Sequence, residues 1–209
     1  MLRLLLVRHG ETDWNASRRY QGQIDIPLNA AGREQAAVLA GRLAAYPICA
    51  LYTSDLERAL QTAQAIAQTC VLEVRSEPRL RELSFGDWQG LTYQQIGELD
   101  PEGLATWNQD RVNRTPPGGE SLGTMAARVQ DLINEICDTY SDGTVALVSH
   151  GGTIRIILCV LLGHPLAAYW QFEVDNTAIA EIELWDLGPV VVRWNDAHHL
   201  TSGHRQGVF

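Results

Sequence analysis

Short apolar runs of strand length alternate along the chain with longer segments whose apolar residues recur at helical spacing. Residues 2–7, 48–53 and 144–148 are nearly continuous apolar runs, as is typical of strands buried on both faces of a sheet. Segments 30–45 and 122–136 carry the helical pattern, with apolar residues three and four positions apart. This alternation predicts an α/β fold with helices on the faces of a sheet.

Local signals refine this picture at the ends of elements. Asn29 is placed to cap the helix over 30–45, and Ser54 and Glu57 have the spacing of a capping box at the start of the next helix. A short strand is expected near residues 71–75. Residues 178–194, with Gly188-Pro189 inside, predict an antiparallel hairpin that closes the sheet.

Residues 76–121 show no regular spacing of apolar residues. This stretch contains Trp88, Trp107 and a Pro-Pro-Gly-Gly turn. We expect short helices and loops here that cover the carboxyl edge of the sheet. Trp14, Trp88 and Trp107 could stack on a ligand ring, although large aromatic residues near loops more often pack a core or lid. A single domain over residues 1–209 is expected, with a mobile tail after about residue 196.

Composition and charge limit the classes of partner. The chain has 209 residues, 45% of them hydrophobic and 20% charged, as in soluble globular proteins. Its net charge of −9 weighs against nucleic acid or an anionic membrane as a partner. No apolar run approaches the roughly 20 residues that span a bilayer, and the first one is too short for a signal peptide. We therefore expect a cytoplasmic protein whose anion chemistry, if any, depends on a local basic pocket.

The cysteines do not form a recognisable site. Cys49, Cys70, Cys137 and Cys159 are scattered and make no CxxC pair, so they are expected to be small buried hydrophobic residues in a reducing compartment. No cysteine is followed at the sixth position by arginine, as in thiolate phosphatases, and no GxxxxGK[ST] nucleotide loop is present.

Two predicted strands end in a histidine followed by glycine, as Arg8-His9-Gly10 and Ser149-His150-Gly151. Ligands of parallel α/β sheets bind outside the carboxyl ends of the strands, so both histidines are expected in one site. A lone strand-end histidine is more often structural. Two histidines beside arginines instead favour phosphoryl transfer, because neutral imidazole can attack phosphorus and guanidinium groups bind phosphoryl oxygens. A metal site is the competing interpretation, disfavoured because the arginines would repel a divalent cation.

Arg58 strengthens the phosphate interpretation. It lies near the first turn of its predicted helix, where the helix dipole disfavours a cation. Asp55 and Glu57 could offset its charge locally. The alternative, which its position favours, is that an anion occupies the helix mouth and that Arg58 and Arg8 bind it together.

A phosphoryl transfer also needs a proton donor for the leaving group. Glu82 lies among apolar residues and beside loop glycines, and a carboxyl partly removed from water can act as a general acid near neutral pH. Spacing alone does not choose Glu82 over Glu77, Asp87 or Glu11.

Several segments, in this order and spacing, together resemble the signature of one family. They are Arg8-His9-Gly10-Glu11-Thr12 with Trp14-Asn15, Gln21-Gly22, Pro27-Leu28 with Gly32, Ser54-Asp55-Leu56-Glu57-Arg58-Ala59 with Gln61-Thr62-Ala63, Glu82-Leu83 with Phe85-Gly86 and Trp88, Pro117-Gly118-Gly119-Glu120-Ser121, and Val148-Ser149-His150-Gly151-Gly152. The chain resembles the histidine phosphatase superfamily, in its phosphoglycerate-mutase-like branch, over nearly its whole length.

The resemblance implies a fold and a set of roles. The fold would be a three-layer α/β/α sandwich around a mostly parallel sheet with an antiparallel edge strand, and the enzyme would need no metal and no cofactor. His9 would become phosphohistidine and Glu82 would donate the proton. The phosphate pocket and substrate contacts would come from Arg8, Arg58, His150, Asn15, Gln21, Gly22 and Gly151. Gln89 departs from the pattern, since relatives commonly have glutamate there, but it is expected outside the phosphate pocket.

The resemblance leaves the substrate and the reaction subclass open. A phosphoglycerate mutase holds a bisphosphorylated intermediate and needs a second cationic subsite. Arg111 and Arg114 are the only cationic residues between Glu82 and Gly118. Because so few cations are available there, the sequence favours hydrolysis of a small-molecule phosphomonoester over phosphate transfer. Length and the segments 116–121 and 172–176 are similar to α-ribazole phosphatases of cobalamin assembly, so α-ribazole 5′-phosphate is the leading named substrate.

Other interpretations stay open beside this one. They are a broad-specificity phosphatase, the mutase, and a non-catalytic phosphate-binding protein, the last disfavoured because every position of the constellation is present. Oligomeric state is open, with a homodimer among the options. The remaining histidines are expected to be surface or structural: His164, His198, His199 and His204.

Overall fold

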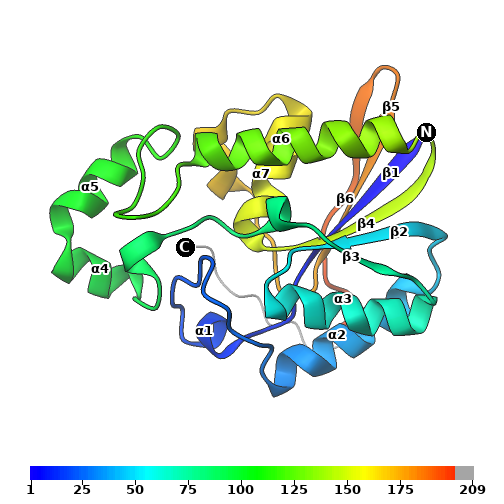
Figure 1. Cartoon of the computed structure of the whole chain (residues 1–209), viewed down its shortest axis with the longest axis horizontal. Coiled ribbons are helices and arrows are strands. Elements are labelled where there is room, and N and C mark those ends of the chain that lie inside the picture. The colour runs from blue at the N-terminus through cyan, green and yellow to red at the C-terminus, as the bar shows by residue number, and fades with distance from the viewer. Residues whose placement is uncertain (201–209) are drawn as a thin grey trace.

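The computed structural model describes residues 1–200, whose strands form a six-stranded sheet in the order β3-β2-β4-β1-β5-β6 (Figure 1). The strands are β1 (Leu2–Arg8), β2 (Ile48–Thr53), β3 (Val74–Ser76), β4 (Gly143–Ser149), β5 (Ile179–Trp185) and β6 (Gly188–Asp196). Strands β1 to β4 pair in parallel, whereas β5 runs antiparallel to β1 and β6 antiparallel to β5. The mostly parallel sheet with its antiparallel hairpin is confirmed, with β6 as the outermost strand.

Helices cover both faces of this sheet, which confirms the three-layer α/β/α arrangement. The helices are α1 (Asp13–Ala16), α2 (Ala30–Leu43), α3 (Glu57–Cys70), α4 (Tyr93–Leu99), α5 (Pro101–Gln109), α6 (Leu122–Thr139) and α7 (Gly151–Leu162), with short 3₁₀ turns η1 (Pro78–Leu80), η2 (Gly86–Trp88) and η3 (Leu166–Gln171). Figure 1 shows α2 and α3 on one face and α6 and α7 on the other.

The apolar strands fill two cores, one on each face. In β1, Leu4 and Leu6 belong to the core under α6 and α7, and Leu5 and Val7 belong to the core under α2 and α3. All four side chains are fully buried. Successive strand residues point to opposite faces, so a strand covered on both sides must be apolar at every position. The continuous apolar runs in the sequence therefore mark the central strands.

The predicted cap of α2 is confirmed, since Oδ1 of Asn29 accepts a hydrogen bond of 2.8 Å from the backbone N–H of Gly32. The predicted capping box at the start of α3 is wrong. Ser54 is fully buried, and its backbone N–H still bonds to Val148 of β4, so the chain cannot yet turn into a helix. Helix α3 begins at Glu57 instead.

The start of α3 is capped by a residue distant in sequence. Oδ1 of Asp25, in the loop before α2, accepts a hydrogen bond of 2.6 Å from the backbone N–H of Glu57. A carboxylate there satisfies one of the unpaired donors of the first turn and complements the helix dipole. The loop after β1 and the helix after β2 are thereby tied together.

Two further expectations need correction. Val71 does not begin a strand but ends α3 in a left-handed conformation, with a φ of 56°, and β3 starts at Val74. Of the cysteines, Cys159 is buried as expected, but Cys49 and Cys137 are exposed. Cys70 is half-buried. Cys49 lies near the start of β2 and Cys137 in the last turn of α6, so each is at the outer end of its element.

Segment 76–121 lies beyond the carboxyl ends of β1, β2 and β4, with α4 and α5 farthest from the sheet (Figure 1). Trp88 and Trp107 are each 2% exposed and pack edge to face, with ring centroids 5.6 Å apart. The indole N–H of Trp88 donates to Asp100, the residue that caps α5. Packing is therefore the main role of this tryptophan pair, and it holds α4 and α5 as an extension of the core.

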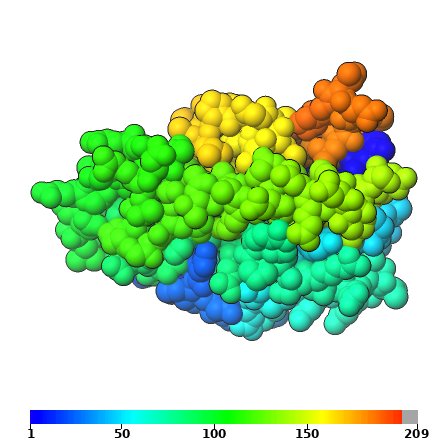
Figure 2. Space-filling model, turned by 45° about the horizontal axis from the view of Figure 1, so that its top comes forward, coloured from blue at the N-terminus to red at the C-terminus, as the bar shows by residue number. Residues whose placement is uncertain are grey.

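At the opposite corner the turn between β5 and β6 projects from the surface beside the N-terminus (Figure 2). Across residues 1–200, none of the helices combines the length and apolarity that a membrane crossing requires. A mobile tail was expected after about residue 196. From residue 201 on, this tail lies outside the described residues. The single-domain interpretation stays a prediction.

Candidate active site

The register of the central strands brings the two strand-end histidines together. Arg8 of β1 lies opposite Ser149 of β4, and the backbone N–H of His9 donates to the carbonyl of Ser149 at 3.0 Å. The rings of His9 and His150 follow directly, with centroids 5.1 Å apart and planes at 60°. The expectation that residues from both ends of the chain form one cluster is confirmed.

His9 is held as a neutral imidazole with a defined tautomer. Its Nδ1 lies 2.6 Å from the carbonyl oxygen of Gly10, so Nδ1 carries the proton and donates it, and Nε2 keeps its lone pair. The side chain is only 3% exposed. Burial, and next the charges of Arg58 and Arg8, lower the pKa of His9 well below its ordinary value. Near neutral pH this imidazole can therefore act as a nucleophile.

His150 has the opposite tautomer. Its Nδ1 accepts a hydrogen bond of 3.2 Å from Nε of Arg58, so the ring proton lies on Nε2. Burial and then the charge of Arg58 lower the pKa of His150 well below its ordinary value. Nε2 is buried and has no hydrogen-bond partner among the described residues. A buried donor without a partner next to His9 is what an incoming oxyanion would satisfy.

Two arginines accompany the histidines, and of these Arg58 is buried and Arg8 is half-buried. Arg58 is fully buried and donates to the carbonyls of Gly22 and Ile24 at 2.7 and 2.9 Å. Arg8 donates from Nη1 to the carbonyl of Val174 at 2.6 Å, while its buried Nε has no partner among the described residues. Burial lowers the pKa of each guanidinium to about 10, so both are charged at neutral pH. Each guanidinium thus bonds to backbone carbonyls rather than to a carboxylate.

Asp55 and Glu57, the two acids beside Arg58 in sequence, bond to other side chains, which removes the local alternative. Asp55 accepts from Nε of Arg81 at 2.7 Å, and that hydrogen bond holds the pKa of Asp55 below its ordinary value. Glu57 accepts from the amide of Gln61 at 2.9 Å. Within residues 1–200 neither Arg8 nor Arg58 forms a salt bridge. An anionic ligand is the partner that this pair of cations lacks.

Glu82 lies at the mouth of α7, next to His150. Its Oε2 accepts a hydrogen bond of 3.0 Å from the backbone N–H of Gly152, and its Oε1 accepts one of 2.8 Å from Leu83. A Cβ on Gly152 would lie 2.3 Å from Oε1 of Glu82, so only glycine lets the carboxylate approach the helix this closely. Both oxygens of Glu82 are therefore oriented by backbone donors.

The segment between η1 and η2, which carries Glu82, is fixed by side chains of the β4–α7 unit. The Ser149 hydroxyl donates to the carbonyl of Leu80 at 2.7 Å, and the Thr153 hydroxyl donates to that of Arg81 at 2.9 Å. Arg128 of α6 reaches the carbonyl of Glu82 at 3.2 Å. The position of this carboxyl thus depends on contacts that a sequence pattern does not reveal.

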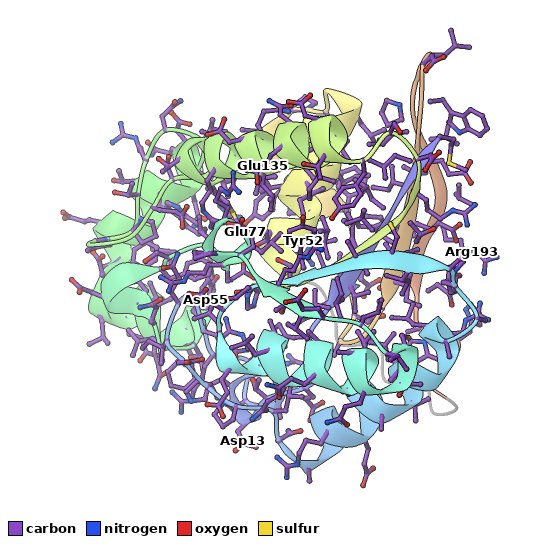
Figure 3. All side chains as sticks on the ribbon, turned by 45° about the vertical axis from the view of Figure 1, so that its right-hand side comes forward. Asp13, Tyr52, Asp55, Glu77, Glu135 and Arg193 are labelled. Carbon is purple, nitrogen blue, oxygen red and sulfur yellow. The ribbon has the colours of Figure 1, made fainter. Side chains whose placement is uncertain are left out.

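The other acids considered as proton donors lie elsewhere. Glu77 is bound by Arg79 at 2.7 Å, and that contact holds its pKa below its ordinary value. Figure 3 shows Glu77 pointing toward Glu135 of α6, which contacts the same arginine. Glu11 accepts from the Asn29 amide at 2.8 Å, and Asp87 is exposed. Among these acids, Glu82 is the candidate that bonds to the first turn of α7, the helix that His150 precedes.

The residues expected to contact substrate surround this cluster. The Thr12 hydroxyl lies 3.1 Å from Oδ1 of Asn15 and 2.9 Å from Oε1 of Gln21, which leaves the two amide NH2 groups as donors directed away from Thr12. A Cβ on Gly151 would lie 3.5 Å from Nε of Arg8, so this glycine borders the guanidinium. Gly22 has a φ of +55° and offers its carbonyl to Arg58.

Sequence reasoning missed the segment that braces His9 from the far side. The amide of Asn176 donates to the carbonyl of His9 at 2.9 Å, and the backbone N–H of Thr177 donates to that of Arg8 at 3.1 Å. Together with the carbonyl of Val174, they fix the end of β1. The only signal in the sequence was the similarity of segment 172–176 to one group of phosphatases, and that similarity does not predict which residues the segment contacts.

Gln89 is closer to the site than expected. Its Oε1 accepts a hydrogen bond of 2.6 Å from the backbone N–H of Gln23, and a Cβ on Gly22 would meet the same oxygen at 2.0 Å. Gln89 therefore supports the loop whose carbonyls hold Arg58. A glutamate at this position would offer the same acceptor oxygen. The glutamine of this chain can therefore make the same hydrogen bond as the residue common in relatives.

The remaining described histidines lie away from the cluster. His164 packs edge to face against Phe172 with ring centroids 5.2 Å apart, and His198 contacts Asp196. His199 lies 3.3 Å from the Thr177 hydroxyl, and burial lowers its pKa. His204 lies outside the described residues.

A cavity of about 330 Å³ opens beside Glu82. Its lining includes Glu82, Gly152, Arg111 and Arg155. Aromatic residues of segment 76–121 form much of the remaining lining. A phosphate held by Arg8 and Arg58 would therefore have room for its organic part on the Glu82 side.

Comparison with known proteins finds similarity over nearly the whole chain. The model of the histidine phosphatase superfamily (branch 1) matches residues 4–197. Phosphoserine phosphatase 1 of Hydrogenobacter thermophilus is 35% identical over 200 residues, which cover 96% of this chain and 95% of that protein. Phosphoglycerate mutase-like protein 4 of Arabidopsis thaliana is 38% identical over 211 residues, covering 99% and 90%. The crystal structure of the α-ribazole phosphatase from Shigella flexneri superposes with a TM-score of 0.86 at 30% identity, covering 93% and 96%.

Proposed function

The chain belongs to the histidine phosphatase superfamily, and from this premise we propose that it is a metal-independent phosphomonoesterase that works through a phosphohistidine on His9. The observation that carries the proposal is the neutral His9 imidazole, with its Nε2 lone pair available. Beside it, the fully buried Arg58 and the half-buried Arg8 lack anionic partners among the described residues. These parts supply a nucleophile and a site for a phosphoryl dianion.

The first half of the reaction transfers the phosphoryl group to the protein. Nε2 of His9 attacks phosphorus, the bond from phosphorus to the alcohol oxygen breaks, and Glu82 gives its proton to that oxygen. Arg8, Arg58 and the Nε2–H of His150 bind the phosphoryl oxygens as charge shifts onto them. The alcohol then leaves.

The second half releases phosphate. Glu82, now a carboxylate, takes a proton from water, and the water oxygen attacks phosphorus while the bond to Nε2 of His9 breaks. Inorganic phosphate departs, His9 is neutral again, and Glu82 has recovered its proton. The backbone donors on Glu82 orient the carboxyl for both steps.

A panel of phosphomonoesters tests the reaction. Phosphate release with and without a chelator is measured for wild type, His9→Ala and the matched surface variant His198→Ala. We expect chelator-resistant release, its loss in His9→Ala, and an acid-labile phosphoprotein after brief exposure to labelled substrate. Activity retained by His9→Ala would refute the nucleophile. Activity abolished by chelator and restored by zinc would support the metal alternative. Binding of phosphate esters without turnover would support the non-catalytic alternative.

Relatives suggest more than one substrate. α-Ribazole 5′-phosphate, the leading named candidate from sequence, is consistent with the likeness to the Shigella flexneri enzyme, and phosphoserine with the likeness to the Hydrogenobacter thermophilus enzyme. The enzyme is proposed to act on such a small-molecule ester, as a monomer or homodimer, with neither nucleic acid nor membrane as partner. The same panel ranks these substrates by kcat/KM.

A phosphoglycerate mutase is a second candidate, because the cavity beside Glu82 contains Arg155 as well as Arg111. Sequence spacing counted Arg111 and Arg114 but not Arg155, which lies on α7. A second cationic subsite is what a bisphosphorylated intermediate needs. Isomerisation of 3-phosphoglycerate that outpaces phosphate release would favour the mutase over the phosphatase.

A further inference from the structure

The cavity beside Glu82 lies where the alcohol part of the substrate must lie. Glu82 and Gly152 line it, and Gly151, the residue before Gly152, borders the guanidinium of Arg8. A proton donor must be within hydrogen-bond reach of the leaving oxygen. If the phosphoryl group sits between Arg8, Arg58 and the histidines, the leaving oxygen points toward Glu82 and the rest of the alcohol enters this cavity.

The cavity wall is cationic. Arg155 donates from Nε to the carbonyl of Phe172 at 2.6 Å, and no hydrogen bond engages its other two nitrogens within residues 1–200. Arg111 stacks over the ring of Trp107 at 4.4 Å and bonds to Asn108. Neither arginine forms a salt bridge among the described residues.

The charges around the cavity do not balance. Of the residues that the structure describes, Glu82 is the only carboxylate in the lining, and both of its oxygens already bond to backbone N–H groups. Tyr20, Tyr93 and Tyr169 add phenol groups to the same wall. Burial raises the pKa of Tyr20 to about 12, so this phenol is uncharged at neutral pH. Two cations thus face a single acid, whose oxygens already accept hydrogen bonds.

From this arrangement we propose that the alcohol part of the substrate carries a carboxylate, which Arg155 binds with help from Arg111. The inference rests on the proposed phosphatase function and narrows its substrate class to phosphomonoesters of hydroxy acids. Guanidinium groups bind carboxylates through paired N–H donors, and such charged bonds strengthen when water is excluded. The aromatic wall limits the rest of the alcohol to a small group.

An uncharged alcohol fits this wall less well. α-Ribazole 5′-phosphate has a neutral base and ribose, and it would leave both guanidinium groups in the cavity without an anionic partner. A second phosphate would bring a dianion, whereas the phosphate pocket uses Arg8, Arg58 and His150 for one dianion. Arg111 is already partly engaged by Asn108 and Trp107, so Arg155 and Arg111 suit a singly charged group better.

Matched substrate pairs test the proposal. 3-Phosphoglycerate and glycerol 3-phosphate have the same three-carbon frame and differ by a carboxylate in place of a hydroxymethyl group, and phosphoserine and phosphoethanolamine differ by the carboxylate alone. We expect kcat/KM to be about 10- to 100-fold higher for the member with the carboxylate, the usual effect of a charged hydrogen bond. α-Ribazole 5′-phosphate and 2,3-bisphosphoglycerate complete the panel.

Variants assign the effect to the two arginines. Arg155→Gln should reduce the preference for the carboxylate most, Arg111→Gln should reduce it less, and Arg155→Lys should keep part of it. Arg114→Gln removes one exposed positive charge near Arg111 and should leave the substrate ratio unchanged. Thermal melting of each variant checks that it folds. The proposal is overturned if the ratio is near one in wild type, if the ratio survives Arg155→Gln, or if α-ribazole 5′-phosphate or the bisphosphate has the highest kcat/KM.

A binding measurement separates this proposal from the proposed function. Calorimetry with the His9→Ala protein measures affinity for 3-phosphoglycerate and glycerol 3-phosphate in the absence of turnover. If wild type hydrolyses none of the esters but binding favours the carboxylate, the phosphatase proposal fails and the carboxylate subsite stands. If wild type hydrolyses both members of each pair equally, and binding is also equal, the phosphatase stands and the subsite fails.

Discussion

Nε of Arg58 donates a hydrogen bond of 3.2 Å to Nδ1 of His150, across the gap between the start of α3 and the end of β4. This bond determines the tautomer of His150, because an acceptor Nδ1 places the ring proton on Nε2. The same guanidinium holds the carbonyls of Gly22 and Ile24. One side chain therefore links the loop after β1, helix α3 and the proposed phosphate site.

Arg58→Lys should lower kcat/KM about 10²- to 10³-fold, the loss typical of removing one donor from a charge-stabilising site. Lysine keeps the charge but lacks the planar fork that reaches His150 and two carbonyls at once. Steady-state kinetics measure the loss, and nitrogen NMR of the His150 ring should show proton exchange between its two nitrogens. Arg42→Lys, on the surface of α2, is the control. Wild-type kinetics in Arg58→Lys would contradict the role of the fork.

Gly152→Ala should lower kcat more than it raises KM. The new Cβ would meet Oε1 of Glu82 at 2.3 Å, so the carboxyl must leave the mouth of α7. Gly41→Ala is a matched control, since Gly41 is inside α2 and a Cβ added to it would have nothing within 4 Å. That control should keep its activity and gain about 0.5–1 kcal/mol in the free energy of unfolding. Equal kinetics in the two variants would contradict the role of Glu82.

Acid should destabilise the protein below about pH 6.5. Burial lowers the pKa of His9 and His150 in the folded state, whereas both imidazoles in the unfolded chain take up a proton near pH 6.5. The unfolded state therefore binds more protons as pH falls through this window, and the free energy of unfolding decreases by up to roughly 1.4 kcal/mol per pH unit per histidine. Above about pH 6.5 this contribution is complete.

Urea unfolding at pH 7.5 and 5.5 measures the acid effect. His9→Ala should remove one of the two contributions and flatten the slope, whereas His198→Ala, whose side chain is 98% exposed, should keep the wild-type slope. The kcat/KM of wild type should stay near its plateau down to the low folded-state pKa of His9. A slope unchanged by His9→Ala would contradict the buried neutral imidazole.

Asp25→Ala should weaken both α3 and the phosphate site. The variant leaves the backbone N–H of Glu57 without its cap, at a cost of about 0.5–2 kcal/mol in the free energy of unfolding. Since Arg58 follows Glu57 and bonds to the carbonyl of Ile24, kcat/KM should also fall several-fold. Asp25→Asn keeps an acceptor oxygen and should recover most of both losses. Chemical denaturation and kinetics measure the two effects, and an unaffected Asp25→Ala protein would show that the cap is dispensable.

The sequence predicted the layers and the central cluster because these depend on local patterns. Continuous apolar runs marked strands buried on both faces, and a histidine directly after each of β1 and β4 had to lie at the same sheet edge once the strands were parallel. Asn29 was predictable as a cap because its partner, Gly32, is three residues away. His9, His150 and Arg58 were found this way.

Contacts between distant segments were not predictable from those patterns. The capping box at Ser54 and Glu57 had the right spacing but was wrong, because pairing of Ser54 with β4 delays the helix and Asp25 supplies the cap. The choice of Glu82 among several acids required the family resemblance, because its hydrogen bond to Gly152 joins segments 70 residues apart. Asn176 was missed because its contact with His9 spans most of the chain.

By itself the sequence determined which residues could carry phosphoryl chemistry, since the apolar periods fix the strands and the strand ends fix the histidines and Arg8. Only the tertiary structure decided the protonation states and tautomers of those groups. Burial keeps both imidazoles neutral, and bonds to Gly10 and Arg58 give them opposite tautomers. It also placed Arg155, from the middle of an apolar helix, in the wall beside Glu82. The burial and the direction of a side chain arise from packing between distant segments, so the hydrophobic periodicity of the sequence does not predict them.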